Sequence, residues 1–276
     1  MADFSFGTLA NLDLADVTSS FNLVYEEYLI PARVDETWIS AHLLQNDIDL
    51  THSTLVTDGA SGEVVGLAIL GVRERRGWIG GFGIAPAYRG RGVSHALMER
   101  AIADARAAGV RDLVLEVLQP NHAAIRTYER AGFERTRELR IYERSGGDRH
   151  TNSADQPVRH DPSELLAMRD HFDVPRPSWQ REAPSLCRME GLEGVSLDDG
   201  SAWAIVTRGN DRLRIFDIVA RDIVSATRLL VALDGETRCA RAVIVNEPSS
   251  SPVIPALAAT GWSEAMHQWE MARRLV

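Results

Sequence analysis

The chain has 276 residues, 45% of them hydrophobic, and a formal net charge of −9, with no lysine among its basic residues. This length suits one large domain or two of ordinary size, and the acidic balance argues against nucleic-acid binding. There is no run of about 18 apolar residues and no signal-peptide pattern, so we expect no membrane span and a cytoplasmic protein. The two cysteines lack metal-like spacing, and we expect neither a disulfide nor a metal site.

Short strands and two helices are predicted for the first third of the chain. Apolar residues recur twice at helical spacing, and apolar runs bounded by glycine-rich turns indicate strands. Asp35 is well placed to cap the second helix, and Pro31 separates it from the first. In chain order, the prediction is a strand over 4–9, helices over 16–29 and from Asp35, and strands over 53–57, 64–72 and 78–84.

The last of these strands contains Gly80, Gly81 and Gly83. Glycine weakens a strand, but it allows another chain or a ligand to approach the backbone closely. A simple β-bulge is the alternative interpretation, and we expect a ligand here.

A turn rich in glycine and arginine follows, and then a helix. Pro86 ends the strand because it has no N–H to donate, while Met98 and Ile102 recur at helical spacing before Gly109 ends the helix. Free backbone N–H groups and the positive end of the helix dipole therefore converge on residues 89–94. Such an arrangement binds a phosphate or pyrophosphate.

Two familiar anion-binding loops do not fit this turn. A Walker loop requires a lysine, and the chain has none. A dinucleotide fingerprint requires three glycines, and only Gly90 and Gly92 are in place. The remaining pattern is Arg-x-x-Gly-x-Ser over 89–94, in which the glycines admit an anion and Arg89 and Arg91 add positive charge.

Residues 80–133 resemble the core of the GNAT acyl-CoA acyltransferases. The resemblance rests on the loop at 89–94, on Ala85-Pro86, on the strand Leu113-Val114-Leu115-Glu116-Val117, and on the run from Asn121 to Phe133, which matches Asn-x-x-Ala-x-x-x-Tyr-x-x-x-Gly-Phe. Ser94 departs from the family, which prefers glycine or alanine there, but serine is small enough to admit a phosphate.

The resemblance implies an α+β fold, with a central, mostly antiparallel mixed sheet flanked by helices, and acetyl-CoA as cofactor. It also implies that main-chain groups near Phe82 and Ile84 hydrogen-bond the pantetheine chain and that Asn121, a good helix N-cap on physical grounds, touches it. The residues expected to hold acetyl-CoA are Phe82, Ile84, Ala85, Arg89, Gly90, Arg91, Gly92, Val93, Ser94, Asn121, Ala124 and Tyr128.

Tyr128 and Glu116 are the candidates for proton transfer. Tyr128 shares a helix face with Ala124 and Ile125 and should point inward; by resemblance, it is the general acid at the thioester sulfur. Glu116 stands among apolar strand residues, where burial would raise its pKa and suit a general base. An ordinary, partly exposed strand residue is the alternative for Glu116.

In the family, the first helical pair covers the acceptor side of the site. The resemblance therefore makes Tyr25, Glu26, Tyr28 and Trp38 candidates for contact with the acceptor. The alternative, which we favour from the sequence alone, is that the aromatic side chains belong to the core and that Glu26 is solvated.

The second half of the chain repeats this order of elements. A helix begins after Asp161, with Pro162 at its first position. Further predicted elements are strands over 202–207 and 213–219, a helix over 224–233, a strand over 241–245, a helix over 252–259 and a strand over 269–274.

This second half resembles a GNAT domain that has lost its cofactor loop. Ile218-Val219-Ala220 is similar to Gly83-Ile84-Ala85, and residues 246–262 are similar to 121–133. The glycines are missing, however, and Asp222 lies where an anion would bind. We therefore predict two GNAT-like domains: a catalytic domain over 1–145, a linker over 146–160 and a degenerate, structural domain over 161–276.

These features predict an acetyl-CoA-dependent N-acetyltransferase that acts on a primary amine by direct transfer in a ternary complex. A ping-pong route is disfavoured because neither cysteine lies near the motifs. A non-catalytic acyl-CoA-binding or regulatory module and a protein-binding adaptor are the alternatives. We expect a small-molecule or peptide amine as partner, no nucleic acid or membrane, and a monomer or homodimer.

Overall fold

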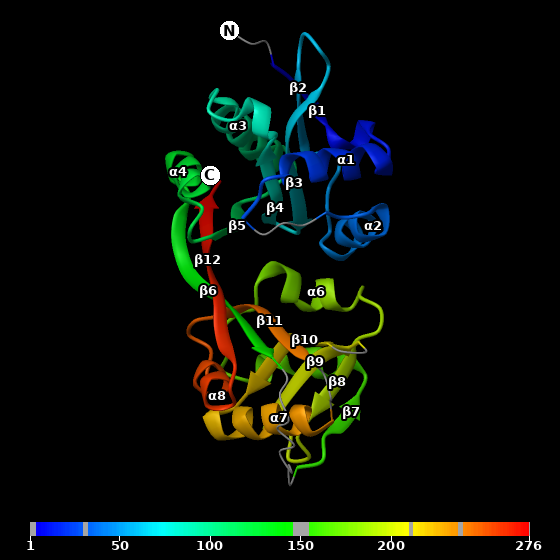
Figure 1. Cartoon of the computed structure of the whole chain (residues 1–276), viewed down its shortest axis with the longest axis vertical. Coiled ribbons are helices and arrows are strands. Elements are labelled where there is room, and N and C mark those ends of the chain that lie inside the picture. Colours follow the sequence, from blue (N-terminus) through cyan, green and yellow to red (C-terminus); the bar gives the residue numbers. More distant parts are fainter. Residues whose placement is uncertain (1–3, 30–32, 146–154, 210–211, 237–239, 276) are drawn as a thin grey trace. The chain divides into compact units, whose positions relative to one another are not determined.

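The computed structural model describes residues 4–29, 33–145, 155–209, 212–236 and 240–275 (Figure 1). The chain divides into two compact units. The N-terminal unit comprises residues 1–136 and 269–276, and the C-terminal unit comprises residues 137–268. No helix in the described part of the chain is long and apolar enough to cross a membrane.

The N-terminal unit is a mixed sheet with helices on both faces. Its elements are β1 (Phe4–Thr8), α1 (Leu14–Val24), α2 (Glu36–Gln45), β2 (Thr54–Asp58), β3 (Val64–Arg73), β4 (Arg76–Ile84), α3 (Val93–Ala107), β5 (Asp112–Leu118), α4 (His122–Arg130), the start of β6 (Glu134–Ser145) and the end of β12 (Ser263–Arg274). The sheet order is β1-β2-β3-β4-β5-β12. The first four strands are antiparallel neighbours, and β4 and β5 are parallel.

Alternate residues of β3 face opposite helical layers. Leu67 and Ile69 pack with α1 and α2, whereas Ala68 and Leu70 pack toward α3. Figure 1 shows the two helical pairs on opposite faces of the sheet. The period of two along a strand is what allows one strand to serve both cores.

The predicted helix caps are confirmed, whereas one helix end is shifted. Asp35 and Asn121 accept hydrogen bonds from the backbone at the starts of α2 and α4. The first helix, predicted to reach Leu29, ends at Val24. The carbonyl of Val24 accepts a hydrogen bond from the Arg89 side chain, at 3.3 Å, instead of continuing the helix.

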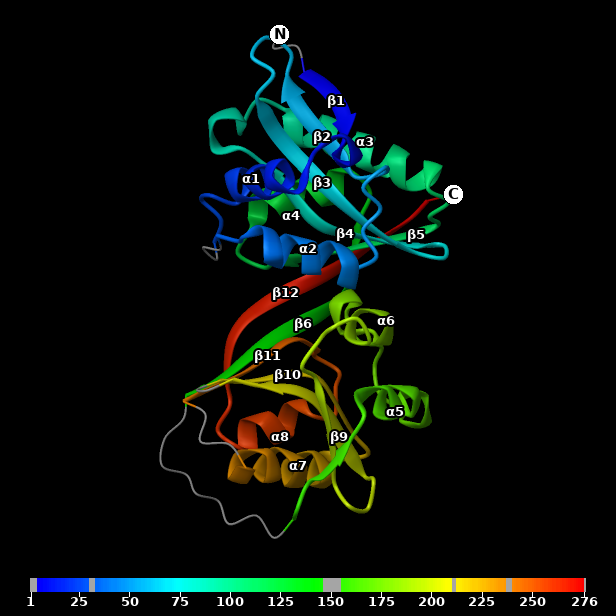
Figure 2. The same ribbon diagram turned by 90° about the vertical axis from the view of Figure 1, so that its right-hand side faces the viewer.

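The C-terminal unit has the same plan. Its elements are the remainder of β6, then β7 (Val158–His160), α5 (Pro162–Ala167), α6 (Ala183–Leu186), β8 (Glu193–Ser196), β9 (Ala202–Arg208), β10 (Arg212–Ala220), α7 (Ile223–Glu236), β11 (Arg241–Pro248), α8 (Ile254–Ala259) and the start of β12. The sheet order is β6-β11-β10-β9-β8-β7, with β10 and β11 parallel. The helices α7 and α8 cover one face and α5 and α6 the other (Figure 2).

In each unit, the strand that follows the parallel pair in the sheet order comes from a distant part of the sequence. Beside β5 lies β12, whose Met271, together with Leu275, is buried in the core formed by α3 and α4. Beside β11 lies β6, whose Tyr142 is buried in the core of the C-terminal unit.

The exchange moves the boundaries away from the predicted domains, 1–145 and 161–276. The division falls within β6, after Thr136, and within β12, before Trp269. The strand β7 occupies the end of the predicted linker, and residues 146–154 of that linker lie outside the described residues. The strands β6, β7 and β8 were not predicted.

Candidate active site

The parallel strands β4 and β5 are paired only near their beginnings. Their register joins Arg76–Ile79 to Asp112–Leu115 and ends there. A β-bulge lies at the same level, because the ladder of β4 with β3 shifts between Ile79 and Gly81. Bulges beside active sites re-aim backbone groups and side chains. The two strands therefore diverge immediately before the predicted site residues.

The glycines of β4 make room for the chain itself, not for the ligand that we expected. A Cβ atom added to Gly83 would lie 2.9 Å from Cβ of Val24, at the end of α1. A Cβ atom added to Gly80 would meet the ring of Trp78, and Gly80 is the extra residue of the bulge. The alternative interpretation, a bulge, is therefore the correct one at Gly80.

The loop before α3 leaves the start of that helix open. Gly90 and Gly92 have φ angles of +76° and +82°, the left-handed region that glycine adopts readily. A Cβ atom added to either would meet nothing within 4 Å. Gly92 forms the N-cap of α3 without any side-chain hydrogen bond, and the first turn contains no acidic residue. In contrast, Asp or Asn side chains cap α1, α2 and α4.

Arg89 does not supply charge to this loop in the way that the sequence suggested. Its guanidinium donates to the carbonyls of Ile84, at 3.0 Å, and Val24, and it forms an ion pair with Glu27. Arg89 thus ties the end of β4 to the end of α1. Arg91 is exposed and lies over the ring of Tyr88, 5.2 Å from its centroid.

The structure brings Tyr25 into hydrogen-bond contact with β4. The N–H of Phe82 donates to the Tyr25 hydroxyl oxygen, at 3.1 Å. The ring of Tyr25 is stacked on Phe21 and meets Tyr28 edge to face, with centroids 4.5 and 5.0 Å apart. Burial, the largest cause, raises the pKa of Tyr25, so that its hydroxyl is neutral at physiological pH.

Tyr128 points inward, as predicted. It is buried, and its ring lies edge to face with that of Phe82, 5.7 Å between centroids. Burial raises the pKa of Tyr128 well above its usual value, and the neighbouring Tyr25 and Tyr28 raise it further. Tyr128 therefore keeps its proton until a stronger base appears beside it.

Asn121, at the start of α4, lies near Tyr28 of the segment after α1. The Asn121 side chain accepts from the N–H of Ala124, at 3.2 Å. Burial raises the pKa of Tyr28, and the nearby Asn121 side chain opposes this shift. Asn121 thus caps α4 beside the aromatic cluster.

Glu116 is half-buried on β5, and its carboxylate is held by a residue that the sequence did not single out. Trp78 of β4 donates from its indole Nε1 to Oε2 of Glu116, at 2.7 Å. This bond crosses from one diverging strand to the other and fixes the direction of the carboxylate. In the sequence, the only indication of this Trp78–Glu116 contact is that both residues lie on predicted strands near the glycine-rich segment.

The remaining candidates lie on the α1 and α2 side. Trp38 is 44% exposed and stacks on His42, with centroids 4.8 Å apart and planes 10° apart, whereas Glu26 is fully on the surface. His42 is buried, and burial lowers its pKa from 6.5 to about 4, so that the imidazole is neutral. The spacing of Trp38 and His42, one helical turn apart, could have revealed this pair.

Comparison with known proteins agrees with this geometry. Residues 18–133 match the acetyltransferase (GNAT) family. The N-terminal part of the chain is thus similar in sequence to the GNAT acetyltransferases. Streptothricin acetyltransferase of Streptomyces lavendulae is 37% identical over 87 residues, which cover 31% of this chain and 46% of that protein. The match thus spans about half the length of this curated relative.

Two solved structures show the same fold over nearly the whole chain. A putative acetyltransferase from Pyrococcus horikoshii has a TM-score of 0.69 at 15% identity, with 99% of this chain and 89% of that chain covered. A tandem GNAT protein from the clavulanic acid biosynthesis pathway has a TM-score of 0.66 at 17% identity, with 99% and 98% covered. The chain therefore has a tandem GNAT fold.

The second GNAT-like unit keeps the diverging strands of the first but fills the space between them. The register of β10 and β11 joins Arg212–Ile215 to Arg241–Ile244, and β10 has its bulge at Phe216. When the two units are aligned on their bulges, Phe216 corresponds to Gly80 and Ile218 corresponds to Phe82. The sequence comparison had instead matched Ile218 with Gly83, one residue further along. Asn246, expected to resemble Asn121, lies within β11 and does not cap a helix.

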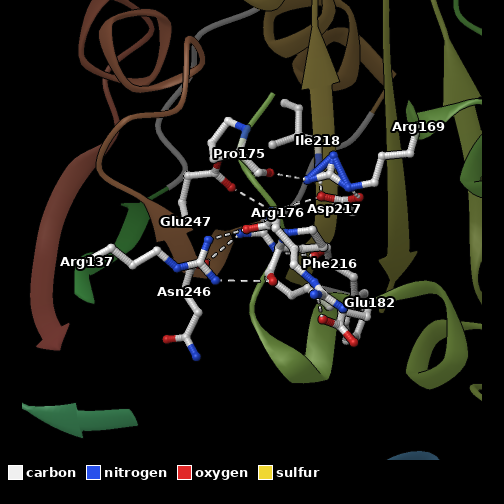
Figure 3. Close-up of polar contacts among 12 residues, drawn as sticks. Arg137, Arg169, Pro175, Arg176, Glu182, Phe216, Asp217, Ile218, Asn246 and Glu247 are labelled. Carbon is white, nitrogen blue, oxygen red and sulfur yellow. Dashed lines mark hydrogen bonds and ion pairs between the residues drawn. The ribbon is translucent and has the colours of Figure 1, made fainter. Parts of the chain in front are cut away.

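A buried arginine lies where the two strands of the C-terminal unit diverge. Arg181 donates to the backbone carbonyls of Phe216 and Asn246, and it pairs with the carboxylates of Asp217, at 3.2 Å, and Glu247, at 2.6 Å. Figure 3 shows four of these partners, namely Phe216, Asp217, Asn246 and Glu247. The N–H of Ile218, the counterpart of Phe82, donates to Oδ1 of Asp217.

The helix after β10 is also closed to anions. Asp222 accepts a hydrogen bond from the N–H of Ser225, at 2.8 Å, in the first turn of α7. Backbone and side-chain hydrogen bonds from Ser225 lower the pKa of Asp222, which keeps it charged. A negative side chain thus takes the position that α3 leaves open, which agrees with the predicted loss of the cofactor loop.

Proposed function

We propose that the N-terminal unit is an acetyl-CoA-dependent N-acetyltransferase that acts on a primary amine by direct transfer in a ternary complex. The observation that carries this proposal is the open start of α3 beside two diverging strands, with Tyr128 and the Phe82 amide at the divergence. Phosphate recognition and acyl-transfer chemistry are therefore available on one face of one sheet.

The residues of the loop fit a pyrophosphate. The first N–H groups of α3 have no side-chain cap, and the space around Gly90 and Gly92 is open. Helix N-termini of this kind favour anions through their N–H groups and their dipole. In the proposed complex, residues 90–94 hold the pyrophosphate by backbone groups, whereas Ile84, Ala85 and Asn121 lie along the pantetheine chain.

Acetyl-CoA supplies the thioester, and side chains of the N-terminal unit handle the protons. Tyr128 is buried and protonated, so it is suited to give a proton to the departing sulfur. Glu116, oriented by Trp78, is the proposed acceptor of the amine proton, directly or through a water molecule. Proton transfer of each kind typically contributes about 10²- to 10⁴-fold to the rate.

The acceptor is proposed to approach from the side of α1 and α2. Tyr28 and Trp38 offer partly exposed aromatic faces there, and Glu26 adds a surface carboxylate. Aromatic rings and carboxylates attract protonated amines. A small amine, an amino sugar or a peptide N-terminus all present this chemistry.

The test combines binding with turnover. Calorimetry with acetyl-CoA and with free CoA should give binding to the purified chain, and release of the CoA thiol should then be followed over a panel of primary amines. Thiol release with stoichiometric acetylamide formation supports the enzyme. Tight binding of acetyl-CoA without turnover on any amine would instead make the protein an acyl-CoA-binding module.

A further inference from the structure

The backbone N–H of Phe82 is directed away from the sheet ladder and toward a side chain. Its hydrogen-bond partner is the Tyr25 hydroxyl oxygen, at 3.1 Å, although Phe82 lies opposite Ala68 in the register of β3 and β4. The N–H lies just past the bulge at Gly80, on the part of β4 that has parted from β5. This donor therefore meets the Tyr25 hydroxyl where β4 has already separated from β5.

Contacts from α1 and from β4 together fix the position of Tyr25. On the helix side, its ring is stacked on Phe21, and its backbone N–H donates to the carbonyl of Phe21. On the strand side, Arg89 donates to the carbonyls of both Ile84 and Val24. Because Gly83 has no side chain, Val24 can sit directly against β4. These contacts hold the phenol of Tyr25 over the Phe82 amide.

The Tyr25 hydroxyl has a proton to give. Its oxygen accepts from Phe82, and no acceptor for its own proton is found among the residues that the structure describes. Accepting one hydrogen bond polarises a hydroxyl and strengthens the bond that it donates. A half-buried donor that its neighbours hold in place matches the requirement of a preorganised oxyanion site.

We propose that Tyr25 is a catalytic residue whose hydroxyl donates a hydrogen bond to the acyl oxygen, with the Phe82 N–H polarising that hydroxyl from behind. This inference rests on the proposed acetyl transfer and adds a residue to it. The edge-to-face contact of Phe82 with Tyr128 keeps the sulfur-side acid on the same stretch of β4. Charge on the oxygen and charge on the sulfur are thus met by two different tyrosines.

The proposed step balances without an additional reactant. The amine nitrogen forms a bond to the acyl carbon, and the C=O electron pair moves to oxygen, where the Tyr25 O–H donates a hydrogen bond without losing its proton. The pair then returns, the C–S bond breaks, the sulfur takes the proton of Tyr128, and Glu116 holds the amine proton. The acyl oxygen gains charge only between these events, so Tyr25 should affect turnover more than binding.

The test is Tyr25→Phe, which keeps the ring stacked on Phe21 and removes only the hydroxyl. We expect kcat to fall about 100-fold, as for loss of one oxyanion donor, with an unchanged acetyl-CoA Kd by calorimetry. Tyr142→Phe is the control, since its hydroxyl contacts Glu264 in the C-terminal unit. An unchanged kcat would overturn the proposal, as would tighter acetyl-CoA binding without loss of kcat, which would make Tyr25 a cover over the amide.

A second substitution guards against a folding defect. Incorporation of 3-fluorotyrosine at position 25 keeps both the shape and the hydroxyl, so most of kcat should be retained if Tyr25→Phe lost it through the missing donor. Loss of kcat in both variants would reject the donor role. Failure of the wild-type chain to turn over any amine, with acetyl-CoA still bound, would instead reject the acetyl transfer on which this inference rests.

Discussion

The two units of this protein share one plan and differ in what fills it. Each has a parallel strand pair that diverges after a short register, a β-bulge at the divergence, and a segment after its first helix that reaches the bulge. In the N-terminal unit that segment delivers Tyr25, a neutral side chain with one hydrogen bond to the strand. In the C-terminal unit it delivers Arg181, which is buried among carbonyls and carboxylates.

This difference shows how the space between two diverging strands of the same fold is either left for a candidate site or filled by a buried side chain. A single hydroxyl–amide bond contributes only about 1 kcal/mol, and it leaves the hydroxyl proton of Tyr25 available to a ligand. A buried guanidinium that pairs with Asp217 and Glu247 cannot leave without exposing unpaired charges, which is far more costly. The same contrast recurs at the helices, where Asp222 caps α7 and only glycine precedes α3.

The most direct test of this difference introduces into the N-terminal loop the acidic residue that the C-terminal unit has at its helix start. Gly92→Asp places a carboxylate at the start of α3, as Asp222 does at α7. Repulsion of the phosphates and strain at a φ of +82° should lower acetyl-CoA affinity by at least about 1000-fold, or about 4 kcal/mol. Calorimetry measures this loss directly.

Gly191→Asp is the matched control for that variant. Gly191 also has a positive φ, of +71°, and open space around it, but it lies in the C-terminal unit. It should carry the cost of strain without any loss of binding. Full acetyl-CoA affinity in Gly92→Asp would contradict the assignment of the loop.

A second test removes the buried arginine that fills the space between the diverging strands of the C-terminal unit. Arg181→Met leaves the carboxylates of Asp217 and Glu247 buried without their main partner, so the C-terminal unit should lose about 3 kcal/mol or more of unfolding free energy. Urea unfolding with a probe in that unit, such as the fluorescence of Trp203, measures the loss. Arg159→Met, which removes an exposed arginine paired with the partly exposed Glu193, should cost about 1 kcal/mol or less. Equal stability of the two variants would show that Arg181 has no special structural role.

Removing the proposed acid should affect only the N-terminal chemistry. Tyr128→Phe should lower kcat about 100-fold and leave acetyl-CoA affinity nearly unchanged, because the ring and its contact with Phe82 remain. Steady-state kinetics and calorimetry on the same preparation separate the two effects. Unchanged turnover would remove Tyr128 as the acid.

The smallest expected effect is a pH dependence that belongs to the N-terminal unit. His42 has its pKa lowered to about 4 by burial, so between pH 6.5 and 4 the unfolded chain binds a proton that the folded chain does not. The unfolding free energy should therefore decrease as the pH is lowered from 6.5 to 4, by at most about 3 kcal/mol from this group. His42→Phe keeps the stacking on Trp38 and should flatten that part of the profile; an identical slope in both proteins would exclude His42 as its cause.

Local features were readable from the sequence where short-range chemistry decides them. The caps at Asp35 and Asn121, the left-handed glycine after α3 and the inward side chain of Tyr128 all follow from residue type and spacing. The missing anion loop after β10 was also visible, because Asp222 stands where glycine would be needed.

Features that depend on contacts between distant segments were not readable in this way. Arg89 looked like an anion ligand because of its place in the loop, yet its donors are taken by carbonyls of α1 and β4. Glu116 could not be assigned an orientation, since its partner Trp78 lies on another strand. Arg181 gave no signal at all, because a buried charge is recognised only by the groups around it.

The sequence by itself determined the resemblance to the GNAT family, most of the strands and helices other than β6, β7 and β8, and which half keeps an open helix start. Residue type and near neighbours control these features through turns, caps and periodicity. Only the tertiary structure decided that β6 and β12 are exchanged between the units and that Tyr25 and Arg181 take corresponding positions. The reason is that strand pairing and burial are satisfied by residues far apart in the chain, and a strand's own sequence does not name its partner.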